Sequence, residues 1–156
     1  MGHKVSAATV LLFAALTALP CAADDVIGLC LGDDMRQRLQ AEMKGLLQAV
    51  HGVHAGLAER NFDAGATTAE AAGSAMVGQV EAHGAHHHGG LPHEFVKLGR
   101  ATHAAFDDLA AVAREGGRPR ELLPALSKVT GHCVECHQQF RLAPAADCVT
   151  EEPATQ

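Results

Sequence analysis

Apolar residues recur at intervals of three and four along most of the chain, which is the spacing of one face of an α-helix. Between residues 33 and 59 this spacing selects Leu39, Met43, Leu46, Val50, Val53 and Leu57. Asp33 and Asp34 stand at the start of the pattern, where acidic side chains favour a helix N-terminus. The pattern predicts a first helix over residues 33–59.

Three further segments show the same periodicity and predict helices over residues 63–82, 92–115 and 121–142. The second has a narrow face of small side chains, whereas the third and fourth carry Phe, Leu and Val on one face. We expect Pro124 in the first turn of the last helix and a helix end before Pro144. Four amphipathic helices with short connections predict an all-α fold, an antiparallel up-down-up-down four-helix bundle.

The first 23 residues have the features of a secretory signal. Lys4 precedes an apolar run of about fifteen residues, which is shorter than the roughly 20 of a membrane-spanning helix. Small residues follow, and we expect cleavage after Ala23 and export to the periplasm. Residues 24–156 then form one domain, and no membrane span is expected.

The excess of acidic over basic residues limits the partners that the chain is expected to bind. The full chain has 12 Lys plus Arg against 18 Asp plus Glu, and the predicted mature chain loses only Lys4 from this set. An acidic domain without a basic stripe is a poor binder of nucleic acid, so no nucleic-acid partner is expected.

Four cysteines remain after the predicted cleavage: Cys30, Cys133, Cys136 and Cys148. Unpaired thiols are a liability in an oxidising compartment. If Cys133 and Cys136 have another role, Cys30 and Cys148 are left to form a disulfide. In the predicted bundle the start of the first helix meets the end of the fourth, which favours this pairing. Two free or intermolecularly paired thiols remain the alternative.

Cys133, Cys136 and His137 form the motif Cys-Val-Glu-Cys-His, which is typical of covalent haem c attachment. On a helix, positions i, i+3 and i+4 share one face, so two thiols and one imidazole converge. The thiols reach the porphyrin edge, and the imidazole reaches the iron. A redox-active cysteine pair, a zinc site that recruits Cys148 and a pair of unligated cysteines are the alternatives.

With these residues in place, the chain resembles the four-helix cytochromes of the cytochrome c prime class and their Met-ligated low-spin relatives. The resemblance covers the whole mature region. It implies one covalent haem near the C-terminus, followed by an aromatic residue and an arginine, here Phe140 and Arg141. Phe140 replaces the commoner tyrosine and removes a hydroxyl group.

The resemblance also implies that a second iron ligand, where one exists, comes from the first helix. Met43 falls at the matching position and is the candidate distal ligand, with core filling as its alternative role. Met35 lies nearer the N-terminus. Arg36, Arg38 and Lys44 are candidates for contact with the haem propionates or for a solvated helix face.

A histidine-rich connection adds a separate candidate site. It contains His83, His86, His87, His88 and His93, and imidazoles four residues apart can hold copper, zinc or nickel. On the third helix, His103 lies either beside the haem or against another neighbour.

These features predict a periplasmic electron-transfer protein that is not an enzyme and exchanges electrons with an unidentified redox protein. The first alternative is a five-coordinate haem protein that binds nitric oxide or carbon monoxide. A periplasmic metal-handling protein that uses the histidine-rich connection is the second. The sequence leaves a homodimer open.

Overall fold

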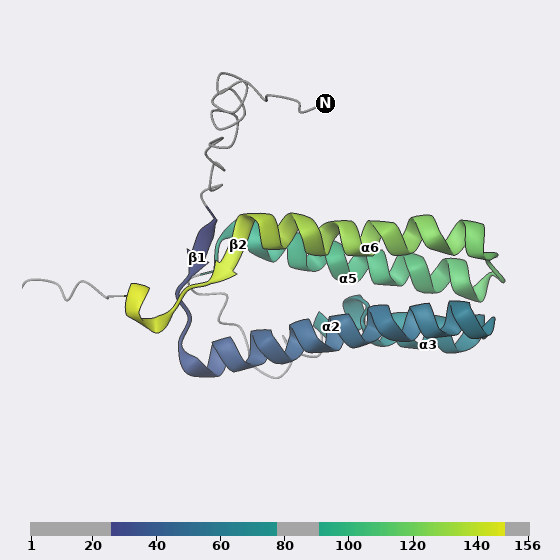
Figure 1. Cartoon of the computed structure of the whole chain (residues 1–156), viewed down its shortest axis with the longest axis horizontal. Helices are drawn as coiled ribbons and strands as arrows, with labels where there is room; N and C mark the ends of the chain where they lie inside the picture. Colours follow the sequence, from purple (N-terminus) through teal and green to yellow (C-terminus); the bar gives the residue numbers. More distant parts are fainter. Residues whose placement is uncertain (1–25, 78–90, 149–156) are drawn as a thin grey trace, which may run out of the picture.

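The computed structural model describes residues 26–77 and 91–148, which exclude the predicted signal segment. Four α-helices account for most of the described chain: α2 (Asp33–Glu59), α3 (Phe62–Ala71), α5 (His93–Arg114) and α6 (Pro119–Gln139). Figure 1 shows α2 and α3 together in one layer and α5 and α6 in another. The prediction of a mostly helical bundle is confirmed, and α2 has the predicted bounds.

The two layers make contact chiefly through α3 and α5, whereas α2 and α6 scarcely touch. Ala66 and Ala69 of α3 are fully buried, and so are Phe106 and Leu109 of α5. Small side chains on α3 let α5 approach closely. The bundle is therefore well packed on its α3–α5 side and loosely joined along the seam between α2 and α6.

A tight turn joins α2 to α3. Arg60 adopts a left-handed backbone conformation, with φ 56°, and ends α2. The Asn61 side chain accepts a hydrogen bond from the Ala64 amide at 3.2 Å and so caps α3. A side chain at Gly56 would lie 2.9 Å from the backbone of both Asn61 and Gly65, so glycine permits this close crossing of α2 and α3.

The prediction of one continuous helix over residues 63–82 is wrong. The α3 helix ends at Ala71, and helical backbone resumes at Ser74. The Asp107 carboxylate on α5 accepts a hydrogen bond from the Ser74 amide at 3.1 Å, which caps the new turn. A Cβ atom at Gly73 would overlap that carboxylate. A long-range contact with α5 thus breaks the helix. Residues 78–82 lie outside the described chain.

The two ends of the last helix also differ from the prediction of 121–142. Pro119 occupies the first helical position, and Pro124 lies in the second turn rather than the first. At the other end α6 stops at Gln139, and β2 (Phe140–Leu142) pairs in parallel with β1 (Ile27–Leu29). The buried ring of Phe140 packs edge-on against Phe95, with centroids 5.4 Å apart, which favours the extended backbone over another helical turn.

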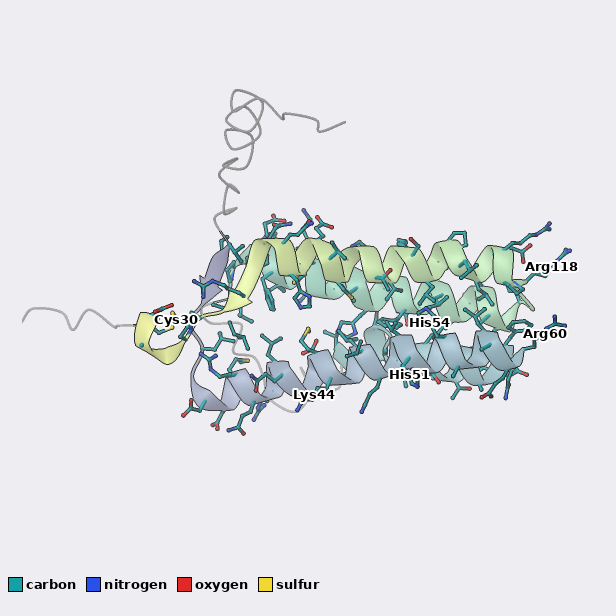
Figure 2. The ribbon with its side chains drawn as sticks, viewed as in Figure 1. Cys30, Lys44, His51, His54, Arg60 and Arg118 are labelled. Atoms are coloured by element: carbon teal, nitrogen blue, oxygen red, sulfur yellow. A yellow bond between two sulfur atoms is a disulfide. The ribbon has the colours of Figure 1, made fainter. Side chains whose placement is uncertain are left out.

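Cys30 and Cys148 follow these two strands and are joined by a disulfide, as predicted, with Cα atoms 5.5 Å apart. Figure 2 shows Cys30 at the end of the bundle opposite to Arg60 and Arg118. The α5 helix agrees with the prediction of 92–115 to within one residue at each end. No helix of the described residues is both long and apolar enough to cross a membrane.

Replacing Gly73 with alanine is expected to destabilise the protein by about 1–3 kcal/mol, because the new methyl group must displace the Asp107 carboxylate that caps Ser74. Urea unfolding followed by circular dichroism measures this change in the free energy of unfolding.

The control is Gly131→Ala on the exposed side of α6, where an added Cβ meets nothing within 4 Å. That variant should be neutral or gain up to about 1 kcal/mol from helix propensity. Equal effects of the two substitutions would contradict the steric explanation.

Candidate functional site

A cavity of about 500 Å³ opens along the seam between α2 and α6. This volume lies within the range of roughly 300–1,000 Å³ that is usual for small-molecule and cofactor sites. The walls are mainly apolar and come from α2, α5, α6, Leu31, Leu91 and the backbone that follows Ser74. The cavity exists because the contacts through α3 and α5 hold α2 and α6 apart.

The predicted attachment motif lies on this cavity. Cys133, Cys136 and His137 all line it, from successive positions on one face of α6. Both cysteines are free and half-buried, and His137 is exposed. The three side chains therefore border one space, and the imidazole is accessible to an occupant of that space.

The two thiols are poor candidates for a redox-active cysteine pair. Burial raises the pKa of the Cys133 thiol, although its own backbone hydrogen bond opposes the change. Burial also raises the pKa of Cys136, and the charges of Cys133 and Glu135 add to that effect. Reactive cysteines in disulfide exchange instead have a lowered pKa that favours the thiolate.

Met43, the candidate distal ligand, lines the same cavity from α2. It is partly buried and packs against the main core. Met35 and Met76 also line the cavity. The sequence pattern does not indicate Met76 as a ligand, because the position of its backbone depends on the helix break at Gly73, which the pattern does not predict.

Phe140 and Arg141 are not among the residues that line the cavity. Phe140 is buried in a second apolar cluster, which Cys136 contacts from its edge. Arg141 is exposed on β2, paired with Gly28 in the ladder. Both residues lie in a strand rather than in the predicted helix, and Phe140 supports the motif through packing.

Basic side chains lie around the cavity as well. Arg38, Lys44 and Arg100 line it, and all three are exposed. Arg36 has a different role, since its Nη2 donates a hydrogen bond of 2.8 Å to the Ala143 carbonyl beyond β2. An anionic group at the edge of an apolar occupant would find complementary charge here.

The one histidine buried in the cavity wall is His103, among the residues that the structure describes. Its Nδ1 lies 2.7 Å from the Ala72 carbonyl oxygen, and its Nε2 lies 3.1 Å from Oε1 of Glu42. Burial lowers the pKa of His103, but the hydrogen bonds to Glu42 and Ala72 and the charges of Glu42 and Asp107 outweigh it. The net pKa is raised.

Most of the histidine-rich connection, the candidate metal site, lies outside the described residues. His83, His86, His87 and His88 lie outside the described residues, and His93 is exposed at the start of α5. Within residues 26–77 and 91–148, no three His, Cys, Asp or Glu side chains are grouped to hold a metal ion.

Comparison with known proteins adds no assignment: no protein-family model, no curated protein and no solved structure matches this chain.

The raised pKa of His103 predicts a pH-dependent stability. Because the pKa in the folded protein exceeds the ordinary value of 6.5, the protonated imidazole stabilises the fold. This stabilisation is complete below about pH 6.5 and is lost as the pH rises through the pKa of the folded protein. Thermal unfolding should therefore occur at lower temperature as the pH is raised across this window.

In the His103→Gln variant, which has no imidazole at this buried position, the same rise in pH should lower the unfolding temperature less. A decline with pH that is as steep as in the unmodified protein would assign the effect to other groups.

Proposed function

We propose that this protein is an exported c-type cytochrome that transfers single electrons. Cys133 and Cys136 would attach one haem, His137 would hold the iron on one face, and Met43 would hold it on the other. The observation that carries the proposal is that one cavity is lined by all four residues, which come from two helices on opposite sides of the seam.

The chemistry of the site residues fits a haem. Two thiols at positions i and i+3 of a helix can each add to a vinyl group at one edge of the porphyrin, and the histidine at i+4 remains next to them. Neither thiol is part of a disulfide, so both sulfur atoms are available for thioether formation.

The cavity also suits the shape and charge of a haem. A porphyrin presents two broad apolar faces, which the aliphatic and aromatic walls from α2 and α5 would cover. Its two propionates are anionic, and Arg38, Lys44 and Arg100 line the same cavity. The residues present thus complement the apolar and the charged parts of a haem.

Met43 decides between transfer of electrons and binding of a gas. A haem iron with histidine and methionine ligands undergoes one-electron oxidation and reduction at a raised potential, which suits an electron carrier. Met43 is partly buried against the core beside the cavity. Its position on the cavity wall, on the other side of the seam from His137, supports a methionine ligand over an open position for a diatomic gas.

We also propose an antiparallel arrangement of the helices, a periplasmic location and a carrier role. The four helices would alternate in direction around the haem. A Cys30–Cys148 disulfide is typical of proteins outside the cytoplasm and agrees with export to the periplasm. The protein would act as a carrier for a redox partner and not as an enzyme.

Expression with a c-type maturation system should give a protein with one covalent haem, and Cys133→Ala with Cys136→Ala should lose it. Mass spectrometry of the denatured protein measures the attachment. The oxidised protein should show the weak long-wavelength band of methionine-ligated haem. Met43→Ala should lose that band and bind carbon monoxide, whereas Met35→Ala, the control, should keep it.

A denatured protein without covalent haem would overturn the proposal. Covalent haem with a high-spin spectrum and immediate carbon monoxide binding in the unmodified protein would reject Met43 as a ligand and identify a gas-binding protein.

A further inference from the structure

His103 and Glu42 form a hydrogen-bonded pair that connects α5 to α2 in the wall of the cavity. The His103 side chain is only 2 % exposed, whereas that of Glu42 is 34 % exposed. The attachment of the haem uses neither residue. The proposed haem attachment therefore gives no role to this buried imidazole and its half-exposed carboxylate partner.

The hydrogen-bond geometry assigns a proton to this pair. Nδ1 of His103 faces the Ala72 carbonyl oxygen, which can only accept, so Nδ1 carries a hydrogen. Nε2 faces Oε1 of Glu42, which also only accepts when the carboxyl is ionised. Both ring nitrogens therefore face acceptors, and the 3.1 Å contact with Glu42 requires an additional proton. The imidazolium form of His103 satisfies both contacts.

The charges around His103 come from several elements. Glu42 faces it from α2, Asp107 acts on it from its own helix, and the Ala72 carbonyl faces it from the residue that follows α3. Asp107 also accepts a hydrogen bond from the Ser74 amide. The remaining titratable groups that line the shared cavity are Arg38, Lys44, Arg100, Cys133, Cys136 and His137. Glu42 is the carboxylate in direct contact with the imidazole.

We propose that reduction of the haem is coupled to the binding of one proton by His103, with Glu42 as its counter-ion and its connection to solvent. This inference rests on the proposed function. One electron from a one-electron donor protein reduces the iron, and one proton from water binds Nε2 of His103. On oxidation the electron leaves to an acceptor protein, and the proton returns to water.

The coupling follows from charge in an apolar cavity. Oxidised haem carries one more positive charge than reduced haem, and this charge opposes the imidazolium. A unit charge roughly 10 Å away, in an effective dielectric of about 20, changes proton affinity about tenfold. His103 should therefore bind its proton more tightly in the reduced protein, and the proton enters through the partly exposed Glu42.

The test is the midpoint potential of the purified holoprotein, measured by redox titration at a series of pH values. The potential should fall as the pH rises between the pKa of His103 in the oxidised protein and that in the reduced protein. At its steepest, the potential should fall by about 59 mV per pH unit, which corresponds to a tenfold change in the ratio of reduced to oxidised protein. His103→Gln should remove this dependence, and His51→Gln, at an exposed position on α2 outside the cavity, should keep it (Figure 2).

Two further measurements support the test if His103→Gln does not fold. Glu42→Gln retains the imidazole but removes its counter-ion, so the pH dependence should move to lower pH. Nuclear magnetic resonance of the His103 ring in the oxidised and reduced protein should show titration at different pH values. A potential independent of pH, a dependence unchanged in His103→Gln or Glu42→Gln, or identical ring titrations would each overturn the inference.

Haem content is measured before the potential, so the two proposals fail separately. A protein without covalent haem overturns the proposed function together with this inference. Covalent haem with no coupling at His103 overturns the inference alone and leaves the haem protein in place.

Discussion

The close packing of α3 against α5 is the constraint on which the rest of the structure depends. Ala66 and Ala69 have no large side chains to separate the helices, and Phe106 and Leu109 of α5 are fully buried. The two layers are joined on that side, so α2 and α6 remain apart on the other. The cavity that brings Met43 together with the Cys133–His137 motif is the result of this unequal packing.

Two residues of α5, one turn apart, fix the backbone at the edge of the cavity. His103 binds the Ala72 carbonyl at the end of α3, and Asp107 binds the Ser74 amide at the start of the next turn. Each side chain satisfies a backbone group that the helix break leaves without a partner. The same two contacts position the backbone that carries Met76, which lines the cavity. These polar interactions therefore both join α5 to the region after α3 and fix part of the cavity wall.

Local patterns predicted those parts of the fold whose causes are local. The bounds of α2 follow from apolar spacing and acidic residues at its start, and the Cys133–His137 motif is a matter of spacing on one helix. The break at Gly73 was not predictable in this way, because its cause is Asp107 on another helix. The end of α6 at Gln139 was missed for a similar reason, since pairing of Phe140–Leu142 with Ile27–Leu29 is a contact between distant segments.

The sequence by itself determined that the chain is helical, that Cys30 and Cys148 are available to each other, and that two thiols and an imidazole share a helix face. The period of the apolar residues, the number of cysteines and the spacing of the motif are all properties of the chain alone. Only the tertiary structure decided that Met43 lies on the same cavity as that face and that His103 is buried against Glu42. These facts depend on how far α2, α5 and α6 stand from one another, and packing between helices sets those distances.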